Sequence, residues 1–256
     1  MNLENLSFSE KTFLVTGAGT GIGASIADRL ITLGAQVILH CNSHVESAKE
    51  LASKAKTDCV VIQKDLSQPQ AGQELVEEIL NLGYAIDGVV NNAAIMTELS
   101  LDDHPSVWEE KWIETLQVNL IAVSSITRRA IEHFKSKGGG IIVNISSRAA
   151  HRGDTPEYIH YAASKAALSN LTKSIARNFA ADGILAYSIC PGFVDTEMAA
   201  EFTQNYPLSE IVSGIPLQRI AQPEEIAAMV VFLLSGQVPS ATGTNIDING
   251  ASYVRA

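Results

Sequence analysis

The sequence predicts an α/β fold in which a doubly wound, parallel seven-stranded sheet carries helices on both faces. Short apolar runs alternate with longer segments of helical periodicity along the whole 256-residue chain. Runs such as 37–39 and 141–143 are apolar on both strand faces, which is typical of a sheet buried between two helix layers. No linker or low-complexity tract interrupts this alternation, so a single domain over residues 1–256 is expected.

The expected elements follow this alternation in chain order. Strands are predicted at residues 12–16, 36–41, 59–63, 87–91, 140–146, 184–190 and 244–248. Helices are predicted at residues 21–33, 45–55, 72–80, 105–134, 158–181 and 223–234. Right-handed crossovers would make the strand order reverse once and leave a crevice at the carboxyl ends of the strands. Functional side chains are therefore expected directly after strands.

The composition disfavours several classes of protein. With 18 basic and 28 acidic residues, the formal net charge is −10, so neither a nucleic acid nor an anionic membrane is an expected partner. Cys41, Cys59 and Cys190 lie far apart at the edges of apolar runs, which favours reduced core thiols. The amino-terminal residues have no signal-peptide pattern, and the longest apolar run, 226–234, is too short to span a bilayer. A cytoplasmic location is the expectation.

A glycine-rich segment follows the first predicted strand. Residues 16–23 read Thr-Gly-Ala-Gly-Thr-Gly-Ile-Gly and run into an amphipathic helix. Gly17 permits a tight turn, while Gly21 and Gly23 allow backbone to approach a pyrophosphate and the helix to pack on the strand. The alternative is a glycine-rich turn without a ligand, which the strand-before, helix-after position disfavours.

Two further polar segments follow strands. Asp65 comes after the third predicted strand, where its carboxylate can accept a hydrogen bond from an adenine amino group or cap a helix. The sequence Asn-Asn-Ala-Ala at 91–94 follows the fourth strand and allows close approach of a nucleotide, with the Asn side chains tying neighbouring loops together. An ordinary Asn-rich turn is the alternative.

The segment Tyr-Ala-Ala-Ser-Lys at 161–165 is the candidate reactive centre. A tyrosine with a pKa near ~10 is a poor acid or base at neutral pH unless a neighbour favours the phenolate. Helical spacing puts Tyr161 and Lys165 on one face, and opposite charges ~4 Å apart at a dielectric of about 20 interact by about 4 kcal/mol, enough to move a pKa by ~3 units. Ser146 and Ser147, at the end of the fifth strand, can hydrogen-bond the same substrate oxygen, and Ser147 is preferred. A surface Tyr/Lys pair and a polar strand end are the alternatives.

Taken together, these motifs resemble the compact short-chain dehydrogenase/reductases, which have a Rossmann-like fold, and the likeness extends over essentially the whole chain. Further matching elements are Asn119 in Val-Asn-Leu and the segment Pro-Gly-Phe-Val-Asp-Thr at 191–196. The resemblance implies that Tyr161 is the general acid/base, that Ser147 polarises the substrate oxygen, and that Lys165 lowers the Tyr161 pKa and holds the nicotinamide ribose. It also implies that Asn119 holds a water in a proton relay and that a substrate lid covers about 196–216.

The resemblance implies a nicotinamide cofactor and a larger set of residues around it. Those residues are Gly17, Thr20, Gly21, Ile22, Gly23, Asn42, Ser43, Asp65, Leu66, Asn92, Ala93, Ala94, Tyr161, Lys165, Pro191, Gly192, Val194 and Thr196. Cys41 stands near the position where NAD-preferring relatives carry an acid, so NADP is favoured over NAD, with neutral donors at Asn42 and Ser43 and at His44. The histidines form no ligand pattern, so no catalytic metal is expected.

The expected activity is hydride transfer between the cofactor and a small ketone or secondary alcohol, as in 3-oxoacyl-carrier-protein reductases and sugar-alcohol dehydrogenases. Two residues depart from those relatives: Asp182, where carrier-protein-binding reductases tend to have Arg, and Tyr187, where Asn is common. One more residue than usual separates Ser147 from Tyr161. A catalytically silent NADP(H)-binding sensor and an epimerase or dehydratase are the competing functions. A homotetramer is expected from the resemblance and from the apolar segments 226–234 and 244–256.

Overall fold

The computed structural model describes residues 6–200 and 207–255, and a seven-stranded parallel sheet lies at its centre. The strand order is β3-β2-β1-β4-β5-β6-β7, with every neighbouring pair parallel. The strands are β1 (Thr12–Thr16), β2 (Gln36–Cys41), β3 (Val60–Gln63), β4 (Gly88–Asn91), β5 (Gly140–Ile145), β6 (Ile184–Pro191) and β7 (Asn245–Ile248). The predicted fold class is confirmed, and the strand order reverses between β1 and β4.

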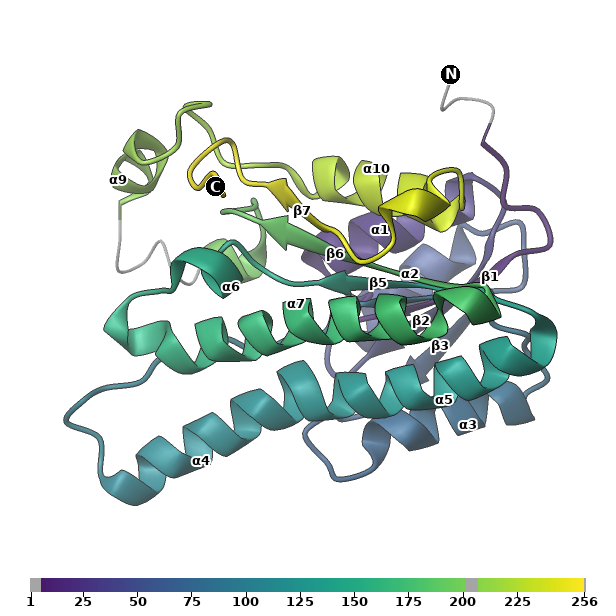
Figure 1. Ribbon diagram of the computed structural model, residues 1–256, viewed down its shortest axis with the longest axis horizontal. Coiled ribbons are helices and arrows are strands. Elements are labelled where there is room, and N and C mark those ends of the chain that lie inside the picture. The colour runs from purple at the N-terminus through teal and green to yellow at the C-terminus, as the bar shows by residue number, and fades with distance from the viewer. Residues whose placement is uncertain (1–5, 201–206, 256) are drawn as a thin grey trace.

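Helices cover both faces of the sheet (Figure 1). One layer holds α1 (Gly21–Thr32), α2 (Val45–Ser53) and α10 (Pro223–Leu234), and α1 packs against α10. The other layer holds α3 (Ala71–Asn81), α4 (Pro105–Leu116), α5 (Val123–Lys137) and α7 (Ile159–Phe179). Two short helices, α6 (Ala149–Arg152) and α9 (Leu208–Ser213), lie at the end of the molecule toward which the strand arrows of β5 to β7 point. An apolar core fills the space on each side of the sheet.

The element boundaries mostly match the predicted ones, with physical reasons for the differences. Strands β1 and β2 have the predicted ends, whereas β3, β4, β5 and β7 are one residue shorter and β6 includes Pro191, a scatter usual at strand and helix ends. The helix predicted at 105–134 is divided: α4 passes into a π-helical turn, Gln117–Ala122, and then into α5, which ends where Gly138 adopts a positive φ of 88°. The helix predicted at 158–181 begins at Ile159 and ends at Phe179. Helices α6 and α9 were not predicted, because segments of four and six residues carry too little periodicity.

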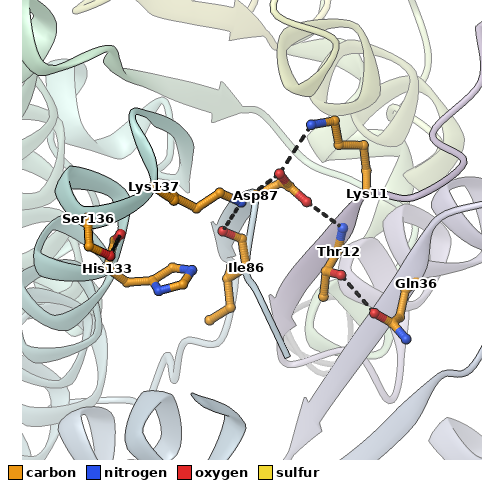
Figure 2. Close-up of polar contacts among 8 residues, drawn as sticks. All are labelled: Lys11, Thr12, Gln36, Ile86, Asp87, His133, Ser136 and Lys137. Carbon is orange, nitrogen blue, oxygen red and sulfur yellow. Dashed lines mark hydrogen bonds and ion pairs between the residues drawn. The ribbon is translucent and has the colours of Figure 1, made fainter. Parts of the chain in front are cut away.

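A charged cluster fastens the amino end of the sheet at the point where the strand order reverses (Figure 2). The Asp87 carboxylate, directly before β4, accepts hydrogen bonds from the Thr12 N–H at 2.9 Å and from Lys137 Nζ at 2.7 Å. Lys11 Nζ donates to it at 3.2 Å. Burial acts to raise the pKa of Asp87, but the hydrogen bonds from Lys137, Thr12 and Lys11 outweigh it and hold the pKa below its usual value. The amino ends of β1 and β4 are therefore joined, and their carboxyl ends meet at the opposite edge.

No helix within residues 6–200 or 207–255 combines the length and the apolar character needed to cross a bilayer.

Candidate active site

A cavity of ≈570 Å³ opens at the carboxyl ends of the strands and collects most of the predicted site residues. At one side it is bounded by the glycine-rich segment and the residues after β2 and β3, and at the other by Ser147, Tyr161 and Lys165. The predicted residues that line it are Gly17, Thr20, Gly21, Ile22, Asn42, Ser43, Asp65, Leu66, Asn92, Ala93, Ala94, Ser147, Tyr161, Lys165, Pro191, Gly192, Val194 and Thr196. Gly23 and Asn119 do not line the cavity, and both support it from behind.

The glycine-rich segment is shaped by two positive φ angles and one close approach. Gly17 has φ +66° and Gly21, the first residue of α1, has φ +54°, a region that glycine enters without strain. A Cβ on Gly23 would lie 2.0 Å from the Gly17 carbonyl oxygen and 2.5 Å from Asn92 Nδ2. Gly23 is thus required for the packing of α1 against the loop. The first N–H groups of α1 have no partner within the helix, which makes this end suitable for an anion.

His40, the fifth residue of β2, braces this loop from below. Its Nδ1 accepts from the Gly17 N–H at 3.4 Å, and its carbonyl accepts from the Ala18 N–H at 2.8 Å. Its Nε2 lies 2.9 Å from the Lys64 carbonyl oxygen. Because an amide N–H only donates and a carbonyl only accepts, the ring is neutral with its hydrogen on Nε2. Burial lowers the pKa of His40 and outweighs the opposite effect of the Lys64 carbonyl.

This brace was missed by sequence reasoning, which considered His40 only as a metal ligand. The available signal was a histidine at the end of a strand that is otherwise apolar on both faces, Val-Ile-Leu-His-Cys. Among the described residues, no group of three His, Cys, Asp or Glu side chains is placed to hold a metal ion.

Asn92 ties the loops after β1 and β4 together. The sequence predicted this role for both asparagines, but Asn91 Nδ2 donates to Asn144 Oδ1 and so joins β4 to β5. Asn92 Nδ2 donates to the carbonyls of Thr16 at 3.0 Å and Gly17 at 3.1 Å. In return, Thr16 Oγ1 accepts from the N–H groups of Asn92 at 2.9 Å and Ala93 at 3.0 Å. These four hydrogen bonds fix the two loops that flank the point where the strand order reverses.

Asp65 lines the cavity but directs its carboxylate at its own turn. Oδ1 accepts from the Ser67 N–H at 2.9 Å, and Oδ2 accepts from Ser67 Oγ at 2.8 Å and Gln68 Nε2 at 3.0 Å. The hydrogen bonds from Gln68 and Ser67 lower its pKa. Since α3 begins only at Ala71, Asp65 stabilises the preceding turn and is not the helix cap considered from the sequence.

Asn119 lies in the π-helical turn between α4 and α5, where it is fully buried. Its Oδ1 accepts from the Ile95 N–H and its Nδ2 donates to the Ile95 carbonyl, both at 2.9 Å. Nδ2 also donates to Ser164 Oγ at 3.1 Å. The single side chain therefore connects the segment after Asn92 to α7, next to Lys165. Isolated π-helical turns occur often at functional sites because they redirect one side chain.

The structure separates the two candidate serines. Ser146 is buried, and its hydroxyl donates to the Lys165 carbonyl at 2.9 Å and lies 2.8 Å from Ser169 Oγ. Ser147 lines the same cavity as Tyr161, and its hydroxyl is close enough to the phenol to act on the pKa of Tyr161. Ser146 thus holds β5 to α7, and Ser147 is the serine that faces the same space as Tyr161.

Helix α7 places Tyr161 and Lys165 on one face, and burial dominates the titration of both. Lys165 Nζ lies 5.6 Å from the centre of the Tyr161 ring and donates to the Ile145 carbonyl at 2.9 Å. Burial raises the pKa of Tyr161 to about 12, against the hydrogen bond from Ser147, and Asp154 raises it further. Burial also lowers the pKa of Lys165 to about 8. The expected lowering of the Tyr161 pKa by Lys165 is not among these effects, so the phenol keeps its proton at neutral pH.

The residues after β2 line the other side of the cavity with neutral donors. Ser43 Oγ lies 3.0 Å from His44 Nδ1, and His44 Nε2 lies 3.6 Å from Glu197 Oε2. Among the described residues that line the cavity, the Lys and Arg side chains belong to Arg148, Arg152 and Lys165, which follow or pack on β5.

The two departures from related sequences have structural roles. Tyr187 is fully buried on β6 in the core shared with α10, and its hydroxyl donates to the Val238 carbonyl at 3.0 Å. The sequence left open whether Tyr187 affects substrate choice or only packing; Tyr187 does not line the cavity and packs in this core. Asp182 pairs with Lys135 Nζ at 3.0 Å on the surface.

Comparisons with known proteins agree with this geometry. A family model described as enoyl-(acyl carrier protein) reductase matches residues 17–251. An acetoacetyl-CoA reductase of Allochromatium vinosum is 33% identical over 245 residues, covering 94% of this chain and 98% of the relative. The structure of a putative NAD(P)-dependent gluconate 5-dehydrogenase of Beutenbergia cavernae with bound NADP superposes with a TM-score of 0.88 at 30% identity, covering 96% of this chain and 98% of the other.

A 3-oxoacyl-(acyl-carrier-protein) reductase of Agrobacterium tumefaciens, with NADP bound, has a TM-score of 0.87 at 31% identity and covers 98% of this chain and 97% of its own. The sequence likeness, the sheet order and the family model extend over nearly the whole chain. The chain therefore belongs to the short-chain dehydrogenase/reductase family of oxidoreductases.

Proposed function

We propose that the protein is an NADP(H)-dependent reductase that transfers a hydride between the nicotinamide and a small ketone or secondary alcohol. The observation that carries this proposal is that Ser147, the buried Tyr161 phenol and Lys165 line one cavity with the glycine-rich loop, with Lys165 Nζ 5.6 Å from the centre of the Tyr161 ring. The test is NADPH oxidation against a panel of ketones, diketones, oxo acids and acetoacetyl thioesters, with Tyr161→Phe as the comparison. Turnover that is unaffected by this substitution would overturn the proposal.

The residues present fit a dinucleotide. The glycine-rich loop, Gly17–Gly23, leaves no room for a Cβ at Gly23. The first turn of α1 opens toward the cavity, and this arrangement of loop and helix start suits a pyrophosphate. No carboxylate stands at Cys41 to repel a 2′-phosphate, and Asn42, Ser43 and His44 offer donors there. The two solved structures described above contain NADP, which supports NADP over NAD for this chain. The bound cofactor supplies the hydride, and the protein supplies the remaining chemistry.

In the reductive direction, the substrate oxygen is held between Ser147 Oγ and the Tyr161 hydroxyl. A phenol with a pKa of about 12 carries its proton at neutral pH, so Tyr161 is ready to donate that proton as the carbonyl oxygen gains charge. Lys165, with a pKa of about 8, exchanges protons near neutral pH. We assign Asn119 to the path that returns a proton to this pair, because it joins Ile95 to Ser164 directly beside Lys165.

A catalytically silent NADP(H)-binding sensor is the alternative, and it is less well supported. A sensor needs the glycine-rich loop but has no use for a serine hydroxyl beside a buried phenol.

We also propose that the segment 196–216 is a substrate lid. Residues 201–206 of that segment lie outside the described part of the chain, while Glu197 and Met198 line the cavity.

We also propose a homotetramer, which rests on the resemblance. The buried apolar side chains of α10 pack with α1 within the subunit, while Ala228, Met229 and Phe232 on the same helix are only partly buried. Strand β7 forms one edge of the sheet and offers its unpaired side to a second subunit. Light scattering at micromolar concentration is expected to give four times the chain mass, and a stable monomer would contradict it.

His40 is expected to control cofactor affinity without touching the chemistry. Because its ring holds the Gly17 N–H and the Lys64 carbonyl, His40→Leu leaves a donor and an acceptor without partners and frees both cofactor loops. We expect Kd for NADPH to rise about 10-fold, with kcat at saturating NADPH unchanged. Fluorescence titration of NADPH together with steady-state kinetics measures the two quantities separately.

Two features make this prediction specific. His40→Asn keeps an acceptor near the position of Nδ1 and is expected to restore part of the affinity. Since burial lowers the His40 pKa, the neutral ring that NADPH binding needs is present above pH ~6.5 and is lost as the pH falls through the lowered pKa. NADPH affinity in the wild type should therefore be flat above pH ~6.5 and weaken at acid pH. An equal loss of NADPH affinity in His40→Asn and His40→Leu, or a fall in kcat alone, would contradict the claim that the hydrogen bonds of His40 support the cofactor loops.

A further inference from the structure

Four charged residues stand between Ser147 and Tyr161: Arg148, Arg152, Asp154 and Glu157. The first three line the cavity. Arg152 Nη2 lies 3.7 Å from Asp154 Oδ1. The charges are close enough for Arg152 and Asp154 to act on the pKa of Arg148, which burial lowers to about 10. Asp154 in turn is close enough to raise the pKa of Tyr161. The group is therefore a cluster directly beside the proposed reactive centre.

The members of the cluster that line the cavity carry more positive than negative charge. Two guanidinium groups there accompany one carboxylate, in a protein whose formal net charge is −10. Glu157 does not line the cavity, although it is close enough to raise the pKa of Asp154. Carboxylates on neighbouring elements, Glu114 of α4 and Glu197 after β6, line other parts of the same cavity. Partly buried charge is costly unless it is paired, so an excess of guanidinium at this position calls for an anionic ligand.

The two arginines differ in what they hold. Arg148 Nη1 donates to Ser252 Oγ at 2.5 Å, and its guanidinium lies 4.7 Å from the centre of the Phe193 ring, so Arg148 braces the carboxy-terminal segment. Arg152 is 38% exposed, and its 3.7 Å separation from Asp154 exceeds the 2.7–2.9 Å of a charge-assisted hydrogen bond. A guanidinium carries five N–H donors in a planar fork that matches a carboxylate. Arg152 is thus the side chain with donors to offer a ligand.

We propose that Arg152 binds a carboxylate of the substrate, and that the protein acts on short oxo acids and hydroxy acids. Asp154 keeps the Arg152 fork on the cavity side, and Arg148 adds positive charge behind it. The reaction is oxo acid plus NADPH plus H⁺ giving hydroxy acid plus NADP⁺: the hydride goes to the carbonyl carbon and Tyr161 gives its proton to the oxygen. This inference rests on the proposed reductase function and narrows its substrate.

A carboxylate at Arg152 lies near the reacting carbonyl, because Arg152 follows Ser147 by five residues and interacts with Asp154 beside Tyr161. An acyl thioester carries no charge next to its reacting carbon and would offer Arg152 no carboxylate to bind. The structure therefore favours a free acid over a thioester.

The experiment compares acids with their own methyl esters at three chain lengths: pyruvate, acetoacetate and levulinate. Calorimetric binding to the enzyme–NADP⁺ complex, in which no hydride is available, gives a Kd that does not depend on turnover, and kcat/KM with NADPH is measured in parallel. We expect at least one acid to bind about 10- to 100-fold more tightly than its ester. Arg152→Gln should remove this preference and leave ester binding within about threefold, and Arg152→Lys should restore part of it.

Arg177→Gln is the matched control, since Arg177 is exposed near the far end of α7 and its loss changes the net charge equally. The inference would be overturned if acids and their esters bind the wild type alike, or if the acids do not bind at ~10 mM. It would also be overturned if Arg152→Gln weakens the binding of acids and of esters by the same factor. Tyr161-dependent turnover of the esters or of acetoacetyl thioesters alone would overturn the substrate class and keep the reductase function. Arg152-dependent acid binding without any turnover would keep the anion site and remove the reductase function.

Discussion

The substitution Tyr161→Phe is expected to lower kcat for NADPH-dependent carbonyl reduction by about 10³-fold, within the range that one general acid contributes. The physical reason is the loss of the hydroxyl that shares the substrate oxygen with Ser147. The ring remains to fill the same buried site, so Kd for NADPH should stay within about threefold and the thermal midpoint should change little. Single-turnover kinetics with saturating NADPH isolates the chemical step.

Tyr158→Phe is the matched control for this prediction. Tyr158 lines the same cavity three residues earlier and is also buried, so its substitution removes a hydroxyl from the same surroundings. We expect kcat to fall by less than about 10-fold in this variant. Similar losses in both variants would show that the cavity needs its hydroxyls for binding or packing, and that Tyr161 is not the proton donor.

The substitution Gly23→Ala should have the second largest effect. The added Cβ would lie 2.0 Å from the Gly17 carbonyl oxygen and 2.5 Å from Asn92 Nδ2. The first is a backbone atom, and the second is held by two hydrogen bonds, so neither can move aside without a large cost in free energy. Helix α1 must move away from the loop, which displaces the first-turn N–H groups proposed to hold the pyrophosphate. We expect Kd for NADPH to rise by at least ~100-fold and the protein to lose about 2 kcal/mol or more of stability.

Gly214→Ala provides the comparison. Gly214 has φ −83°, and the nearest atom to an added Cβ is the Ile211 carbonyl oxygen at 3.5 Å, an ordinary contact. Neither NADPH affinity nor the thermal midpoint should change appreciably in this variant. Wild-type NADPH affinity in Gly23→Ala would mean that the glycine-rich loop does not hold the cofactor.

The sequence was sufficient for the fold because its signals are local. Strands β1 and β2 are short, mostly apolar and mostly buried runs with glycine-containing turns beside them, and both were predicted to the residue. The single reversal of the strand order was predicted from right-handed crossovers, whereas the order itself was not predicted. The π-helical turn at Gln117–Ala122 was not predictable, since residues 105–134 read as one continuous helix and the turn is accompanied by the contact of Asn119 with Ile95 across the fold.

The sequence indicated which residues form the candidate site better than it indicated how those residues interact. Ser146 and Ser147 are adjacent in sequence, and only the packing of β5 on α7 shows that Ser146 faces Lys165 and Ser169. The pKa of Tyr161 was expected to fall near Lys165, but burial of the phenol has the larger effect. Desolvation depends on every neighbour in space, so it cannot be read from the spacing of two residues.

Charged residues around the reactive centre were the largest omission. Arg148, Arg152 and Asp154 lie within seven residues of one another, directly after the serine that was singled out, yet no role was considered for them. A cluster of charges in a segment flanked by two proposed catalytic residues was the available signal. Helix α6 brings it to the cavity, and that four-residue helix was itself not predicted.

The central claim, that this protein moves a hydride between a nicotinamide and a carbonyl carbon, is tested most directly by isotope transfer. The best substrate of the carbonyl panel is reduced with NADPH carrying deuterium at C4 of the nicotinamide, on the face that the enzyme uses, and the product is analysed by mass spectrometry and NMR. The account predicts one deuterium at the new carbinol carbon for each NADPH consumed, and none in Tyr161→Phe over the same time. Product formed without label or without net NADPH consumption would contradict it, as would tight NADPH binding with no product from any carbonyl compound tested.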